Sequence, residues 1–337
     1  MIKTTDTQCS TTKNSAPLIV RIGAEFIATT LAMFTIYTFY SFTTVIWGVN
    51  VLTIAAGTGF AYATAAYITS KISGGHLNPA VTVASMLTGR TPYAAGLCYI
   101  VAQVIGSIVA AGLFILTIPH MNSNVDPSQL NQGSGFDKKN WLTLIINGFE
   151  KGSLLSRQIK EINLSFGIVS ALLVEVIAVI LIVATALRST DNEGNTKCGY
   201  ATHIGIAYAA GSLLTYQITG ASLNPARSTG IALFANFYDF EVNPLTQLWL
   251  FWVAPIFAAA IVSFAVLLTK LLREPHSPSA LTNKHGNHND SRISAQNNKS
   301  VNTNNVNNAY NANNAYNANN ANNTNNAAYL TNSARNK

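Results

Sequence analysis

The sequence is poor in charged residues and in cysteine. Only 10% of its 337 residues are charged, whereas a typical soluble domain has about 25%, so an ordinary soluble protein is excluded. Three cysteines, Cys9, Cys98 and Cys198, are too few and too widely spaced for a disulfide framework or a clustered metal site. The sequence also lacks the residue spacings of a catalytic triad, a phosphate-binding loop or a metal cluster. We therefore expect no enzyme activity, no cofactor and no metal.

Acidic side chains are fewer than basic ones, and the formal net charge is +7. A basic excess can indicate nucleic-acid binding, but here the charges avoid the long apolar runs and form no basic face. We attribute the excess to membrane topology and expect no nucleic-acid partner.

Apolar residues make up 49% of the chain and gather in long runs. A helix that crosses a bilayer needs roughly 20 mostly apolar residues, and six runs are long enough. They cover about 19–46, 50–70, 95–118, 163–187, 200–218 and 246–271. The sequence predicts an all-α integral membrane protein with six transmembrane helices.

Two further apolar segments, near 78–88 and 224–235, are too short to cross a bilayer, and each begins with the same tripeptide. The tripeptide is Asn78-Pro79-Ala80 in the first segment and Asn224-Pro225-Ala226 in the second. Non-helical backbone at membrane depth must be buried in protein or line a wet cavity. We predict two re-entrant half-helices around a pore or an internal site.

The chain contains one internal repeat. The second Asn-Pro-Ala lies 146 positions after the first, and Glu175 lies 150 positions after Glu25. Three spans and a half-helix therefore occur twice, in about 18–118 and about 163–273, joined by a long loop over 119–162. Because three is odd, the halves have opposite orientations, and the half-helices meet near the bilayer midplane in an inverted repeat.

The start of a helix carries roughly half a positive charge and unpaired N–H groups. Proline suits the first helical position and asparagine the cap, so Asn78 and Asn224 are predicted to cap the half-helices and to direct an amide N–H at the permeant. Two positive helix ends favour an uncharged, oxygen-bearing solute and oppose cations, protons included. The pattern predicts a channel for water or another small neutral molecule.

Two Asn-Pro-Ala motifs in a six-span frame, the second followed by Arg-Ser, resemble the aquaporins of the major intrinsic protein family. The resemblance covers residues 18–273 and implies a homotetramer in the lipid bilayer with one pore in each protomer. Ser228, Ala232 and the pair Phe251-Trp252 resemble the water-channel branch more than the glycerol facilitators.

By the spacing of this family, the outer selectivity filter consists of Thr58, Ser212, Ala221 and Arg227. Typical water-selective members combine an aromatic ring, a histidine and a small or Cys residue with the arginine, so only the arginine is retained here. Three small side chains predict a wider filter that admits small neutral solutes besides water, because pore diameter and lining donors decide selectivity. Phe60 is the alternative lining residue to Thr58.

Four other polar residues are candidates for supporting the pore. For Glu25 and Glu175 the favoured interpretation is a buried acceptor for the N–H groups of a re-entrant loop, rather than a proton relay. Gln103 is expected to hydrogen-bond the first loop rather than line the pore. His76 either lines the inner vestibule or stabilises the loop.

Lys and Arg residues that flank the spans lie mostly on one side, which predicts that both termini are cytoplasmic. Residues 1–17 then form a cytoplasmic tail, 119–162 an extracellular loop and 274–337 a disordered, Asn-rich cytoplasmic tail. The host membrane is left open between the plasma membrane and an intracellular vacuolar membrane.

The connection between the fourth and fifth spans contains candidate gating residues. They are Ser189, Thr190, Thr196 and Tyr200. Phosphorylation there could move a plug over the pore mouth, with an ungated connector as the alternative. The sequence thus predicts a passive water channel, and it leaves two alternatives of the same fold: a glycerol- or urea-type facilitator, and a gated or closed protein with a scaffold role.

Overall fold

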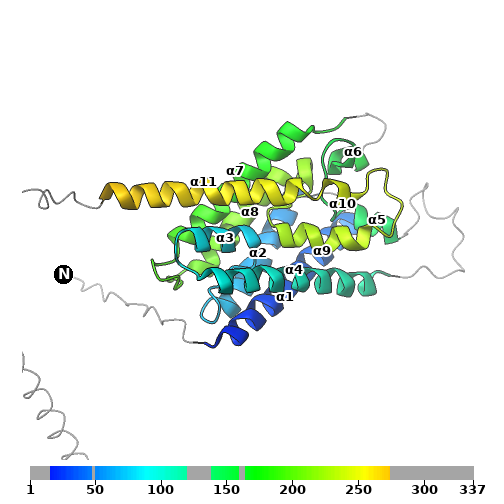
Figure 1. The fold of residues 1–337 in the computed structure, drawn as a ribbon. Coiled ribbons are helices and arrows are strands. Elements are labelled where there is room, and N and C mark those ends of the chain that lie inside the picture. Colours follow the sequence, from blue (N-terminus) through cyan, green and yellow to red (C-terminus); the bar gives the residue numbers. More distant parts are fainter. Residues whose placement is uncertain (1–15, 48–49, 120–137, 159–163, 274–337) are drawn as a thin grey trace, which may run out of the picture. The chain divides into compact units, whose positions relative to one another are not determined.

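The structure, a computed structural model, describes residues 16–47, 50–119, 138–158 and 164–273 (Figure 1). Within these ranges it consists of helices and loops, with no β-sheet. The predicted tails over 1–17 and 274–337 lie almost wholly outside the described residues.

Six long helices form the body of the described chain. They are α1 (Leu18–Trp47), α2 (Val51–Thr69), α4 (Tyr93–Thr117), α7 (Ile168–Arg188), α8 (Tyr200–Thr219) and α11 (Leu250–Arg273). Five of them are long and apolar enough to cross a membrane, the last together with the short α10 (Pro244–Gln247) before it. The sixth, α8, has 20 residues but a more polar composition, and it packs along both α2 and α7. The predicted all-α architecture is confirmed.

Two short helices lie between the long ones and begin at the repeated tripeptides. They are α3 (Pro79–Leu87) and α9 (Pro225–Ala235). Each packs against the last long helix of the other repeat, α3 on α11 and α9 on α4 (Figure 1). Since α2 also packs on α8, the two repeats interlock along corresponding elements, as an inverted repeat requires.

The long loop between α4 and α7 is partly folded where the structure describes it. It contains α5 (Lys138–Thr143), a 3-10 turn η2 (Glu150–Gly152) and α6 (Leu154–Gln158). Trp141 and Leu142 are buried. The side-chain amide of Gln247 accepts a hydrogen bond from the Phe149 N–H and donates one to the Phe149 carbonyl, each at 2.9 Å. This part of the loop is therefore a packed cover over the helix ends, not only a connection.

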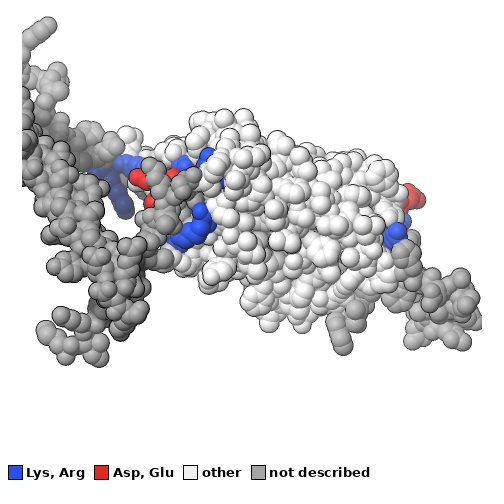
Figure 2. All heavy atoms as spheres, turned by 90° about the horizontal axis from the view of Figure 1, so that it is seen from below, with Lys and Arg blue, Asp and Glu red and all other residues white. Residues whose placement is uncertain are grey.

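The outside of the helical body is apolar. Leu116 and Phe264 are 78% and 68% exposed, which suits contact with lipid tails rather than with water. On the face shown in Figure 2, charged side chains gather at the two ends of the described fold, and the wide band between them is uncharged. The chain is an integral membrane protein that crosses the bilayer several times.

Glycines at equivalent positions of the repeats allow α2 and α8 to touch. A Cβ atom on Gly59 would lie 2.8 Å from the carbonyl oxygen of Gly205, and one on Gly205 would lie 2.6 Å from that of Gly59. These distances are too short for any side chain, so the two backbones are in direct contact, as small residues permit between membrane helices.

We expect Gly59→Val to destabilise the fold by about 1–3 kcal/mol, the usual cost of forcing extra atoms into a packed core. The measurement is thermal unfolding of the purified protein in detergent. Gly23→Val is the matched control, because a Cβ atom on Gly23 has no neighbour within 4 Å. Equal melting temperatures for the two variants would contradict the proposed close contact.

Candidate pore and selectivity filter

The two Asn-Pro-Ala tripeptides cap α3 and α9 in the same way. The Oδ1 atom of Asn78 accepts a hydrogen bond from the Ala80 N–H at 2.8 Å, and that of Asn224 accepts one from Ala226 at 2.9 Å. A proline occupies the first turn of each helix. The half-helices thus begin with the cap and the proline that the sequence predicts.

The side-chain amides of these asparagines use both of their N–H donors within the protein. Asn78 donates to the carbonyl of Leu223 at 2.9 Å and to the Tyr208 hydroxyl at 2.8 Å. Asn224 donates to the carbonyl of Leu77 at 2.7 Å and to the Tyr62 hydroxyl at 2.8 Å. The amide N–H that was predicted to face a permeant molecule is therefore bonded to a tyrosine hydroxyl in this conformation.

The two tyrosines lie face to face between the half-helix starts. The ring centroids of Tyr62 and Tyr208 are 3.3 Å apart, and the ring planes differ by 4°. Both residues are 1% exposed. The two tyrosines are not among the predicted site residues, although Tyr208 follows Tyr62 by the same 146 residues that separate the motifs. That shared offset was the available signal.

Glu25 on α1 holds the first re-entrant loop. Its Oε1 atom accepts hydrogen bonds from the Ser73 hydroxyl at 2.6 Å and the His76 N–H at 2.9 Å. Its Oε2 atom accepts bonds from the Leu77 N–H and the Gln103 side chain, both at 2.8 Å. Leu77 has a φ of 55°, unusual for a residue with a side chain, so the carboxylate stabilises a strained turn.

Glu175 on α7 repeats this arrangement in the second half. Its carboxylate accepts bonds from the Thr219 hydroxyl at 2.5 Å, the Ser222 N–H at 3.1 Å and the Leu223 N–H at 2.9 Å. Leu223 has a φ of 57°. Both glutamates are fully buried, and both accept hydrogen bonds from loop N–H groups.

His76 and Gln103 also bond within the first loop region. Nδ1 of His76 lies 3.1 Å from the Thr82 hydroxyl, and its ring stands edge-on to Tyr99. Gln103 donates to Thr82 at 3.0 Å as well as to Glu25. With His76 buried, these contacts favour loop support over a place in an open vestibule.

The four predicted filter residues are all buried, and Tyr40 of α1 connects three of them. The Tyr40 hydroxyl lies 2.6 Å from the Thr58 hydroxyl and 3.2 Å from that of Ser212. The guanidinium of Arg227 sits 5.3 Å from the centre of the Tyr40 ring, a cation–π distance. Phe60 is 73% exposed, so it is Thr58 and not Phe60 that faces this site.

The three small side chains predict a wide filter, but Tyr40 lies beside them. Its hydroxyl contacts the hydroxyls of Thr58 and Ser212, and its ring faces the guanidinium of Arg227. Tyr216 stacks edge-on against the same ring, with centroids 5.2 Å apart. An aromatic ring is thus present at the filter, but it comes from a different helix.

Arg227 is held by Asn147 of the loop between α4 and α7. Its guanidinium donates to the Asn147 side-chain oxygen and, at 3.0 Å, to the Gly220 carbonyl. Asn147 also accepts a bond from Ser228 at 2.7 Å and donates to Gly220 at 2.9 Å. Asn147 lies in a loop without a recognisable motif, so no sequence signal identified it.

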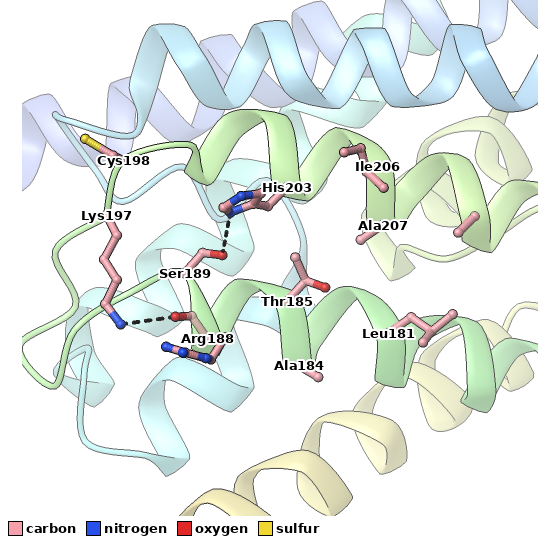
Figure 3. A pocket seen from close by; sticks show the side chains of 11 residues that line it. Leu181, Ala184, Thr185, Arg188, Ser189, Lys197, Cys198, His203, Ile206 and Ala207 are labelled. Atoms are coloured by element: carbon pink, nitrogen blue, oxygen red, sulfur yellow. Dashed lines mark hydrogen bonds between the residues drawn. The ribbon is translucent and has the colours of Figure 1, made fainter. Parts of the chain in front are cut away.

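The connector between α7 and α8 is fixed by hydrogen bonds of the candidate gating residues. Ser189 bonds His203 at 3.2 Å, and Figure 3 shows the two side chains directed at one another beside a pocket of about 770 Å³. Thr196 donates to Ser70, and the hydroxyl of Tyr200 donates to the Gly75 carbonyl at 3.0 Å. Ser189, Thr196 and Tyr200 are buried, so a kinase could reach them only after local opening.

Charged groups strengthen this connector. Arg90, in the turn after α3, donates to the Thr190 hydroxyl and to the Leu187 carbonyl. Its burial lowers the pKa of the guanidinium, and Asp191 opposes that shift. Burial tends to raise the pKa of Asp191, but hydrogen bonds from Asn195 and the Glu193 N–H, together with the charge of Lys197, hold the pKa below its ordinary value. Thr190 therefore serves as a structural contact in this conformation.

Comparison with known proteins agrees with this geometry. The sequence profile described as Major intrinsic protein matches residues 12–266. This chain belongs to the major intrinsic protein family. As a member of that family it is a membrane channel for water or small solutes, and the family is not a class of enzymes.

Relatives of this major intrinsic protein include two bacterial proteins named Aquaporin Z. The one from Brucella melitensis is 34% identical over 216 residues, which cover 64% of this chain and 81% of the relative. The one from Rhodopseudomonas palustris is 32% identical over 215 residues, covering 64% and 77%. The crystal structure of the aquaglyceroporin from Plasmodium falciparum has the same fold, with a TM-score of 0.54, 16% identity and coverage of 76% of this chain and all of that one.

We expect Glu175→Ala to lower the stability by about 1–3 kcal/mol for each buried N–H group left without an acceptor. Ser222 and Leu223 would each lose their acceptor. Thermal unfolding in detergent measures the effect. Glu193→Ala is the control, because Glu193 is exposed on the connector. A variant as stable as this control would contradict the role given to Glu175.

Proposed function

We propose that this protein is a passive channel that conducts water in preference to glycerol or urea. The observation that carries the proposal is the filter, where Arg227 and the Tyr40 ring face one another beside Thr58 and Ser212. A filter narrowed by an aromatic ring and a cation favours the smallest neutral solute, because pore diameter and lining groups decide selectivity.

The buried positive charge of Arg227 also supports the exclusion of ions. Its Nε atom is buried and has no hydrogen-bond partner among the described residues, so this N–H is free to donate to the oxygen of a passing molecule. Farther in, the starts of α3 and α9 add two positive helix ends. A neutral oxygen-bearing solute gains from these donors, whereas a cation or a proton meets a barrier.

Residues beyond the filter support water over larger solutes. Ser228, Ala232, Phe251 and Trp252 resemble the water-channel branch, and the curated relatives above carry the name Aquaporin Z. The likeness to the aquaglyceroporin concerns the fold alone. We therefore favour a water channel over a glycerol- or urea-type facilitator.

Placement in the membrane is part of the proposal. We propose cytoplasmic termini, because Arg21, Lys71, Arg188 and Arg273 stand at the helix ends that share a side with both termini. The loop between α4 and α7, which carries Asn147, then faces the extracellular or luminal side of the membrane. The resemblance to the family supports a homotetramer with a pore in each protomer.

Stopped-flow light scattering on proteoliposomes tests the function. We expect faster shrinkage than in empty vesicles when an impermeant osmolyte is added, and no re-swelling when the osmolyte is glycerol, because the filter admits water alone. Fast re-swelling in glycerol would instead identify a solute facilitator. Shrinkage at the rate of empty vesicles, with folded protein inserted, would contradict water conduction by the unmodified protein.

We expect Tyr40→Ala to admit glycerol and urea, because it leaves only small side chains opposite Arg227. Solute-driven re-swelling of proteoliposomes is the measurement, and the rate should exceed that of the unmodified protein. Tyr93→Ala is the control, since Tyr93 is 64% exposed on α4. If Tyr40→Ala excludes glycerol as strictly as the control does, Tyr40 does not determine the filter width.

A further inference from the structure

We propose that Tyr62 and Tyr208 form a central gate of the pore, closed when their rings stack and open when the rings separate. The proposal rests on the channel function proposed above and adds the residues that limit its rate. The gate lies between the starts of the two half-helices, and it consists of uncharged side chains from α2 and α8. Tyr62 is one helical turn from Thr58, and Tyr208 is one turn from Ser212.

The position of the pair follows from its hydrogen bonds. The Tyr208 hydroxyl accepts from Asn78 and the Tyr62 hydroxyl accepts from Asn224, each at 2.8 Å. The remaining N–H of each asparagine is bonded to a backbone carbonyl. The tyrosine hydroxyls therefore stand where an oxygen of the permeant would have to bind these amides.

The rings also close the space between the two helices. Parallel rings with centroids 3.3 Å apart leave no room for a water molecule between them. A solute that passes between Asn78 and Asn224 must displace at least one ring. The stack is thus a steric barrier as well as a competitor for the asparagine donors.

The two tyrosines are related by the internal repeat, both in sequence and in their contacts. Tyr62 and Tyr208 occupy equivalent positions of the repeats, and each bonds the asparagine of the opposite half: Tyr62 in the first repeat bonds Asn224, and Tyr208 in the second bonds Asn78. The two contacts therefore close the pore symmetrically from both halves.

The closed state is held by contacts that can break reversibly. One aromatic stack and two hydrogen bonds between neutral groups favour closure, and their loss predicts a rise in permeability of about tenfold or more. No covalent bond or ion pair locks the pair among the described residues. The unmodified channel therefore conducts water in the fraction of time in which the rings are apart.

The test compares water permeability of proteoliposomes that contain the unmodified protein, Tyr62→Val/Tyr208→Val, or the control Tyr93→Val. We expect the double variant to shrink about tenfold faster than the unmodified protein, while the control keeps the unmodified rate. Because barriers in series mask one another, the same pair of substitutions is also made in the Tyr40→Ala background and compared with Tyr40→Ala alone. Circular dichroism and size-exclusion chromatography verify that each variant is folded.

The possible results distinguish a failure of the proposed gate from a failure of the proposed channel function. Measurable conduction by the unmodified protein with no increase in the double variant, in either background, overturns the gate and leaves the water channel intact. No conduction by any folded variant, the triple variant included, overturns both. Conduction that appears only after the tyrosines are replaced supports the gate.

A second double variant identifies the part of the tyrosines that acts. Tyr62→Phe/Tyr208→Phe keeps both rings and removes both hydroxyls. We expect a permeability well below that of the valine pair, since the rings still occupy the constriction. A phenylalanine pair as permeable as the valine pair would overturn the assignment of the barrier to the stacked rings.

Discussion

A re-entrant segment inside a membrane cannot leave its N–H groups without acceptors, and the rest of this structure depends on how that demand is met. Two buried carboxylates meet it. Glu25 binds the turn before α3, and Glu175 binds the turn before α9. With the turns fixed in this way, each asparagine cap bonds the loop of the other half, and Arg227 lies in the first turn of α9. The positions of the proposed filter and of the central constriction therefore both depend on the two buried glutamates.

The helices could be predicted from the sequence because each of them has a strong local signal. Apolar length predicts the long helices, and the repeated tripeptide predicts α3 and α9 to within a residue at most boundaries. The fourth span begins at Ile168 rather than 163, because Gly167 before it is extended. Glu25 and Glu175 were identifiable as acceptors because an isolated carboxylate in an apolar run requires donors nearby.

Contacts between segments far apart in the chain could not be predicted from a local sequence pattern. Tyr40 reaches Thr58 and Ser212 from a helix whose sequence shows many similar apolar and aromatic positions, so composition alone did not distinguish it. Asn147 comes from a loop without a repeat partner. The stacked tyrosines were detectable in principle through their shared offset, but only the packing of α2 on α8 reveals that they meet.

The contact of Gly59 with Gly205 limits which motions can open the proposed gate. Both glycines lie three residues before a gate tyrosine, and the backbones there already touch, so α2 and α8 can neither approach nor slide freely. Separation of the rings must therefore come from torsions of the tyrosine side chains. Such torsions turn single buried rings and leave the two helix axes in place, unlike the microsecond-to-millisecond rearrangements of whole helices. The outer surface of the helical body is therefore the same in the open and the closed channel, and neighbouring lipid does no work when the gate opens.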